Sequence, residues 1–299
     1  MTRRKAQPRQ QSKKSSKGVK ARQTARTKRN RVIATTSIAA VVVAFVAAIA
    51  FGGRKPTPGA SGVSDATTVA GRVTGVLAST LDQVGVGQGV TPVEMLPPST
   101  PPLTQNGKPD VFYYGAEYCP YCAGQRWPLT VALSRFGTFS GLGITTSSSN
   151  DTAPDTPTVS YHGSTYTSNY LVFSPVELQT RTGETLDTPT PAQQDLVNTY
   201  DTAPYTTDPG AIPLLMIGNR YIQIGSSIDP ASLAGMTQLQ VATALSDPTA
   251  ATTQEIGGAA NMFTAALCQL TNGQPVDVCT APGVKAGGSL LPAAPVGGP

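Results

Sequence analysis

Two cysteines separated by two residues, Cys119 and Cys122, follow an apolar run at 111–114 and precede a stretch with helical periodicity. The thiolate is the reacting form of cysteine, and the unpaired N–H groups at the start of a helix stabilise it and lower its pKa. Pro120 has the backbone φ of a first helical turn. We therefore expect Cys119 to be the attacking sulfur and Cys122, one turn later, to resolve a mixed disulfide.

The same spacing also occurs in half of a zinc site and in structural bridges. A zinc site needs two further ligands, and His162, the only histidine of the chain, lies in a polar stretch far from any pair of cysteines. We expect no metal and no organic cofactor, because the redox couple would be the dithiol Cys119–Cys122 itself.

The N-terminus has the charge pattern of a membrane anchor. Residues 1–31 contain 13 Lys or Arg residues and no acidic residue, and residues 32–51 carry no charge. Twenty such residues are about the length that spans a bilayer as a helix. The positive-inside rule then predicts a cytoplasmic tail (1–31), a single transmembrane helix (32–51) and an extracytoplasmic remainder. Because Ala48-Ile49-Ala50 resembles a signal-peptidase site, a cleaved signal peptide is the alternative.

The net charge of +5 comes from the tail. It holds 13 of the 22 basic residues, which leaves 9 against all 17 acidic residues, a balance of −8 for the exported part. This balance argues against a nucleic-acid-binding ectodomain. Beside a membrane span, the basic tail is expected to contact anionic lipid, and binding of RNA or DNA by the tail is the alternative.

Residues 52–102 are predicted to be a linker with a short structured segment. The stretch 52–64 is rich in Gly, Pro and Ser, and a second, proline-rich stretch ends at residue 102. Between them, residues 65–90 carry apolar side chains at helical spacing. A short strand at 73–76 followed by a capped helix is the alternative.

From residue 103 onward, predicted strands and helices alternate. Strands are predicted at 111–114, 142–146, 158–161, 170–173, 211–217 and 221–224, and helices at 119–136, 190–200, 237–245 and 252–270, with another opening at Asp229. Asn106-Gly107 and Gly218-Asn219 predict turns. Residues 147–189, rich in Ser, Thr, Asp and Tyr, are predicted to be an insertion, and 281–299 to be a disordered tail.

This order of elements resembles the thioredoxin-like fold over about residues 109–245. More closely, the string GAEYCPYCAGQRWPLTVALSRFGTFSGL, with IPLLMIGNRY and the later ALCQL and VC, resembles a family of membrane-anchored prokaryotic proteins catalogued as a domain of unknown function. The resemblance implies an α/β fold: a thioredoxin-like domain (103–280) with an insertion near 147–189 and C-terminal helices, preceded by the transmembrane helix.

The thioredoxin superfamily also implies a substrate groove. Its proline opposite the CxxC is cis, and Pro213, preceded by Ile212, is the matching residue; a plain strand-edge proline is the alternative. Pro120 and Tyr121, the dipeptide of glutaredoxins, would complete the groove. Tyr118 stands where thioredoxins have Trp, which leaves the client and the direction of electron flow open.

Two charged residues are candidates for supporting the dithiol. Arg126, four residues after Cys122, would lie on the same helix face and stabilise a thiolate; a solvated surface charge is the alternative. Glu117, two residues before Cys119, would accept a proton from the resolving cysteine; an exposed loop acid is the alternative.

A second cysteine pair, Cys268 and Cys279, brackets ten residues. Outside the cytoplasm, two cysteines so close in sequence usually form a bridge. We expect a structural staple on the last helix. The alternative is a second dithiol that exchanges electrons with Cys119 and Cys122.

These features together predict a membrane-tethered, extracytoplasmic thiol:disulfide oxidoreductase. Its partners would be client proteins with thiols or disulfides and an unidentified electron partner. The alternative is a non-catalytic, membrane-anchored thioredoxin-like binding protein in which the CxxC is structural and the insertion docks a partner.

Overall fold

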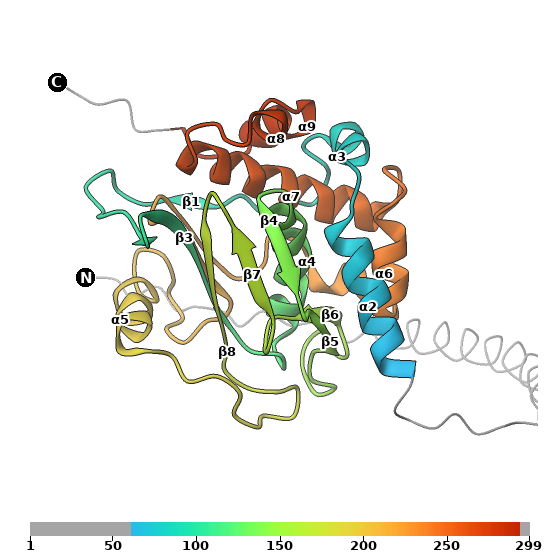
Figure 1. Ribbon diagram of the computed structural model, residues 1–299. Helices are drawn as coiled ribbons and strands as arrows, with labels where there is room; N and C mark the ends of the chain where they lie inside the picture. The colour runs from blue at the N-terminus through green and yellow to red at the C-terminus, as the bar shows by residue number, and fades with distance from the viewer. Residues whose placement is uncertain (1–60, 294–299) are drawn as a thin grey trace, which may run out of the picture. The chain divides into compact units, whose positions relative to one another are not determined.

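The computed structural model describes residues 61–293. The predicted tail (1–31) and anchor (32–51) lie outside these residues. Across 61–293, no helix has both the length and the apolar character that crossing a bilayer requires. This part of the chain is a mixed α/β fold in which helices cover a central sheet (Figure 1).

The central sheet is built around β3 (Lys108–Gly115). β3 lies parallel to β8 (Val172–Glu177) and antiparallel to β9 (Leu214–Ile217), with Val111 opposite Phe173 on one side and Ile217 on the other. Three further strands complete the sheet: β10 (Tyr221–Ile224) beside β9, β1 (Glu94–Met95) beside β10, and β2 (Thr104–Gln105) in a hairpin with the start of β3. The predicted turns at Asn106-Gly107 and Gly218-Asn219 are confirmed.

Both faces of the sheet are buried. Alternate side chains of a strand point to opposite faces, and each set packs into its own apolar cluster. Leu214 and Met216 join a smaller apolar cluster, to which α5 (Pro191–Tyr200) contributes. Leu215 and Ile217 join the larger cluster on the other face. This double burial explains why β9 is apolar at every position.

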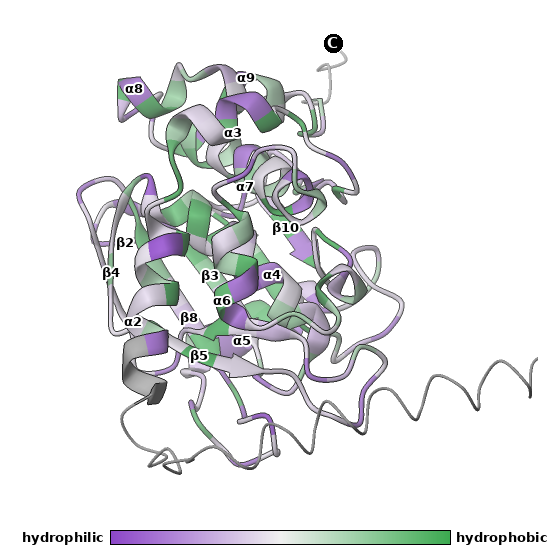
Figure 2. Ribbon diagram, turned by 90° about the vertical axis from the view of Figure 1, so that its right-hand side faces the viewer, coloured by the Kyte–Doolittle hydropathy of each residue, from purple (hydrophilic) through white to green (hydrophobic). Residues whose placement is uncertain are grey.

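The larger cluster is covered by a layer of helices. α4 (Pro120–Ser134) packs against α7 (Ala251–Leu270), and α2 (Ser61–Thr74) packs against α6 (Gln238–Ala244) and α4. Trp127 of α4 is fully buried there, and its indole N–H donates to the carbonyl of Pro157 at 2.8 Å. Figure 2 shows the hydrophobic residues concentrated on β3 and the surrounding helices.

The prediction of a linker at 52–102 is wrong for most of its described part. α2 begins at Ser61, inside the stretch expected to lack structure, and α3 (Ala78–Val84) follows a break after α2. The proline-rich stretch contributes β1 to the sheet. The helix predicted over 65–90 is thus present as two helices, and the alternative strand at 73–76 is not.

The predicted insertion at 147–189 also needs correction, because it contains β8, a strand of the central sheet. The predicted strand at 142–146 forms β5 (Gly143–Thr146), which pairs only with β6 (Pro157–Ser160) in a separate ribbon. A second ribbon pairs β4 (Gly137–Ser140) with β7 (Thr165–Ser168), and neither of these strands was predicted. The added material is therefore these two ribbons.

The prediction of a disordered tail at 281–299 is wrong for residues 282–288. Residues from 282 form α9 (Pro282–Gly288), which packs on α7 and α3. A Cβ at Gly283 would lie 2.5 Å from the carbonyl oxygen of Leu81, and one at Gly287 would overlap the backbone of Asn261. The glycines that suggested disorder are the residues that permit this close packing. The remaining short elements are η1 (Pro230–Leu233) and α8 (Val276–Cys279).

Candidate active site

The two cysteines stand where β3 passes into α4. Cys119 is the N-cap residue of α4, Pro120 occupies its first turn, and the Cys119 sulfur accepts a hydrogen bond from the Cys122 backbone N–H at 3.3 Å. This sulfur therefore satisfies one of the N–H groups that a helix start leaves without a partner. The helix start predicted at this position is confirmed.

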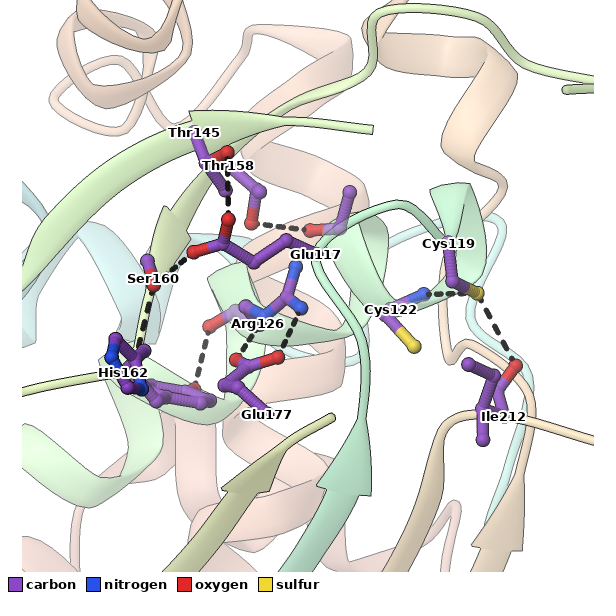
Figure 3. Close-up of polar contacts among 12 residues, drawn as sticks. Glu117, Cys119, Cys122, Arg126, Thr145, Thr158, Ser160, His162, Glu177 and Ile212 are labelled. Carbon is purple, nitrogen blue, oxygen red and sulfur yellow. Dashed lines mark hydrogen bonds and ion pairs between the residues drawn. The ribbon is translucent and has the colours of Figure 1, made fainter. Parts of the chain in front are cut away.

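A second segment reaches the same sulfur from the other half of the fold. The Cys119 Sγ lies 3.4 Å from the carbonyl oxygen of Ile212 (Figure 3). The bond between Ile212 and Pro213 is cis, as predicted. Only a protonated sulfur donates to this carbonyl, so the Cys119 thiol uses the bond to Ile212 whereas the thiolate keeps the N–H donor of Cys122.

The two thiols differ in burial and in acidity. Cys119 is 5% exposed and Cys122 is 0% exposed, while Tyr121 between them is 46% exposed. The hydrogen bond from Cys122 lowers the pKa of Cys119, and the charge of Arg126 adds to this effect against the opposing effect of burial. Burial raises the pKa of Cys122 well above its ordinary value. Cys119 is thus the more acidic thiol of the pair, and Cys122 the less acidic one.

Arg126 lies beneath the dithiol in a buried ion pair, so its interpretation as a solvated surface charge is wrong. The side chains of Arg126 and Glu177 are both 0% exposed. The Arg126 Nε donates to one oxygen of Glu177 at 2.7 Å, and its Nη2 donates to the other at 2.6 Å (Figure 3). Burial raises the pKa of the Glu177 carboxyl and Arg126 opposes this; the two-pronged geometry keeps the pair ionised.

A crowded polar pocket surrounds Cys122. The Arg126 guanidinium lies over the ring of Tyr113 at 5.7 Å. Within the described residues, the Tyr113 hydroxyl and the Arg126 Nη1 have no hydrogen-bond partner. A Cβ at Gly115 would stand 2.5 Å from the Tyr113 hydroxyl and 3.0 Å from the Cys122 sulfur. Only glycine at this position leaves room for both groups.

Glu117 faces away from the dithiol, toward the β5–β6 ribbon. Its carboxylate accepts hydrogen bonds from the Ser160 hydroxyl at 2.6 Å and the Thr145 hydroxyl at 3.3 Å (Figure 3). It is half-buried, so the alternative of an exposed loop acid is wrong. No contact joins it to Cys122 among the described residues, and we give it no part in the dithiol chemistry.

The second cysteine pair forms a disulfide, as predicted. Cys268 and Cys279 are bonded, with a Cα–Cα distance of 5.6 Å, and they join the end of α7 to α8. His162 hydrogen-bonds to Asp187 at 2.8 Å. Over residues 61–293, no three side chains of His, Cys, Asp or Glu cluster as metal ligands would.

Glu177 is the site residue that sequence reasoning missed. It ends β8, inside the stretch predicted to be an insertion, and the parallel pairing of β8 with β3 places it opposite Gly115. An acidic residue that ends an apolar strand was the available signal.

A family model described as "Domain of unknown function (DUF929)" matches residues 97–269, and the chain belongs to this family. The comparisons with curated proteins and with solved structures gave no match. The matched region contains both cysteines of the dithiol, Arg126, Glu177 and the Ile212–Pro213 segment.

Proposed function

We propose that this member of the family is a thiol:disulfide oxidoreductase that uses Cys119 and Cys122. The observation that carries the proposal is the asymmetry of the pair: a capping sulfur with a lowered pKa stands next to a buried sulfur with a raised one. A structural bridge or a metal site has no need for this difference, whereas sequential attack and resolution depend on it.

The reaction of the reduced form follows from these positions. The Cys119 thiolate attacks one sulfur of a client disulfide, and the other client sulfur leaves as a thiolate and takes up a proton. Cys122 then loses its proton and attacks the Cys119 sulfur, which releases the second client thiol. The protein dithiol becomes a disulfide and two electrons pass to the client; the reverse sequence oxidises a client dithiol.

The arrangement of the sheet supports a thioredoxin-like architecture. β3, α4 and the parallel strand β8 form one half, and the antiparallel pair β9–β10 with the helices after it forms the other. The carbonyl of Ile212 against the Cys119 sulfur supports a groove made by Pro120, Tyr121, Ile212 and Pro213. A client backbone lying there would meet both halves of the fold.

We propose further that the protein acts outside the cytoplasm, tethered by residues 32–51. The lopsided charge around that segment supports this orientation, and the disulfide between Cys268 and Cys279 suits an oxidising compartment. A reporter fused after residue 60 should be active only outside the cytoplasm. Activity confined to the cytoplasm would overturn the placement.

One observation favours the alternative, a non-catalytic binding protein: Cys119 is almost as buried as Cys122. A redox titration separates the two functions. The full-length chain is equilibrated with glutathione buffers, alkylated with a maleimide-polymer and resolved by gel shift. Reversible exchange that Cys119→Ser abolishes supports the oxidoreductase. A pair that neither exchanges nor alkylates in the folded protein would establish the alternative.

A further inference from the structure

A hydrophilic cavity opens beside the candidate dithiol, next to Tyr118. Its volume is about 620 Å³. Two loops form its walls, residues 148–151 between β5 and β6 and residues 179–183 after β8. They belong to segments far apart in the sequence, and the cavity lies where these segments meet.

Main-chain hydrogen bonds fix both loops to the residues directly before Cys119. The Ser148 N–H donates to the carbonyl of Tyr118 at 2.8 Å, and the Glu117 N–H donates to the carbonyl of Gln179 at 2.9 Å. The position of the cavity relative to the nucleophile is therefore set by the backbone. A polypeptide bound through a cysteine at Cys119 has this cavity within reach of its neighbouring residues.

The cavity is lined almost entirely by hydrogen-bonding side chains. Apart from the ring of Tyr118 and from Gly183, the lining consists of hydroxyl, amide and charged groups: Ser148, Ser149, Asn150, Asp151, Gln179, Arg181 and Thr182. No aliphatic side chain is among them. An apolar segment placed here would remove water from these groups without replacing their hydrogen bonds, which is unfavourable.

Polar contacts also connect the two walls with each other. Arg181 and Asp155 form an ion pair at 2.5 Å that joins one loop to the other. Within the first loop, the Asn150 N–H donates to the Ser148 hydroxyl at 3.2 Å. These side chains are exposed to solvent, so their remaining hydrogen-bonding groups are accessible to a ligand.

Two further groups near the dithiol are not part of the cavity lining: the exposed ring of Tyr121 and the backbone carbonyl of Ile212, which contacts the Cys119 sulfur.

We propose that the hydrophilic cavity receives the part of a client polypeptide that adjoins its reacting cysteine. The protein then selects clients whose cysteine is flanked by hydrogen-bonding side chains such as Ser, Thr, Asn and Gln. The inference rests on the proposed function, because the client is held at the cavity by its bond or approach to Cys119.

The test compares two peptide dimers of equal length, each linked by one cystine. One carries Ser, Asn and Thr around the cysteine and the other carries Ala and Val. The full-length chain is reduced and freed of reductant, and the second-order rate constant for reducing each dimer is measured. In this reaction the protein dithiol becomes a disulfide and each dimer becomes two thiols, so electrons and protons balance.

The wild-type chain should reduce the hydrophilic dimer about tenfold faster, which corresponds to one or two hydrogen bonds. The double substitution Ser149→Leu with Thr182→Leu should bring the ratio of the two rate constants close to one. A matched control, Thr165→Leu with Thr167→Leu on the exposed face of β7, should keep the wild-type ratio. If the lining variant does not fold, Asn150→Ala should lower the ratio about threefold.

The small substrate 2-hydroxyethyl disulfide separates the two ways of failing. A wild-type chain that reduces it but reduces both peptide dimers at equal rates would overturn the assignment of the cavity alone. A ratio that survives in both lining variants would do the same. A wild-type chain that reduces none of the three substrates would overturn the proposed function, and the client preference with it.

Discussion

Replacing Arg126 by Met should destabilise the protein by about 3–5 kcal/mol, the cost of breaking a buried ion pair from one side. Both partners are fully buried, and Arg126 donates two hydrogen bonds to the Glu177 carboxylate oxygens. The substitution leaves a carboxylate in the core without its counter-charge. Arg72→Met, at an exposed position of α2, is the matched control and should change stability by less than about 0.5 kcal/mol.

The loss should depend on pH in a direction that the pair dictates. Burial already raises the pKa of Glu177 above its ordinary value of 4.5, and removing Arg126 takes away the main opposing effect. In the variant the folded state therefore holds a proton that the unfolded state releases. Stability then falls as pH rises from about 4.5 toward the raised pKa of the folded state. Urea unfolding of the Arg126→Met chain should show a larger deficit at pH 8 than at pH 5.

The double substitution Arg126→Met with Glu177→Leu should recover most of the lost stability, because no unpaired charge remains. Its Cys119 should nevertheless be less acidic than in the wild type, since the charge of Arg126 contributes to the lowered pKa. If Arg126→Met loses no more stability than Arg72→Met, or its deficit is the same at both pH values, the reasoning on the ion pair is refuted.

Three further outcomes follow from the same structure. Alkylation of the reduced chain should reach half its maximal rate below pH 9.0 in the wild type, because hydrogen bonding lowers the pKa of Cys119, and a midpoint at or above pH 9.0 would contradict this. Replacing Cys268 and Cys279 by Ala should lower stability by about 2–5 kcal/mol and leave disulfide exchange at Cys119 intact; lost exchange with unchanged melting would make that pair a redox relay. Gly115→Ala should lower the free energy of unfolding by about 1–3 kcal/mol through overpacking against Tyr113, and it should slow the attack of Cys122 on a mixed disulfide. A variant with wild-type stability and wild-type exchange would contradict the close packing around Gly115.

The parts of the site that the sequence predicted are determined by residues adjacent in the sequence. Cys119 directly precedes a proline that starts a helix, and that order is sufficient to place its sulfur at the N-cap. The hairpin at Asn106-Gly107 and the helix after Thr190 have equally local signals, and both formed as predicted. The cis bond before Pro213 was different, because it was implied by a resemblance.

The parts that the sequence did not predict depend on distant pairings. Strand β8 is only two residues longer than the strands of the outer ribbons, and its pairing with β3 is what makes it central. Since β8 was assigned to an insertion, Glu177 had no reason to meet Arg126, 51 residues earlier. An arginine on a helix with unknown neighbours is read as exposed because most arginines are.

Composition misled where glycine serves packing. The segment after residue 281 is rich in Gly and Ala, a composition shared by disordered tails and by helices that approach another backbone closely. Gly283 and Gly287 lie one helical turn apart and meet the backbones around Leu81 and Asn261. The spacing of four was visible in the sequence, but the backbone it faces was not.

The buried ion pair between Arg126 and Glu177 is best explained by its effect on the two cysteines. A buried pair generally adds little to stability, and apolar residues of similar volume are often as good or better. Arg126 and Glu177 therefore need a reason beyond holding α4 to β8. The guanidinium has one N–H group, Nη1, without a partner among the described residues, and its charge lowers the pKa of both cysteines against the effect of burial. A thiolate sealed from water requires such a fixed positive charge, and the charge in turn requires Glu177 to be tolerated in the core. The near-complete burial of Cys119 raises its pKa, and the charge of Arg126, which Glu177 balances, opposes that effect.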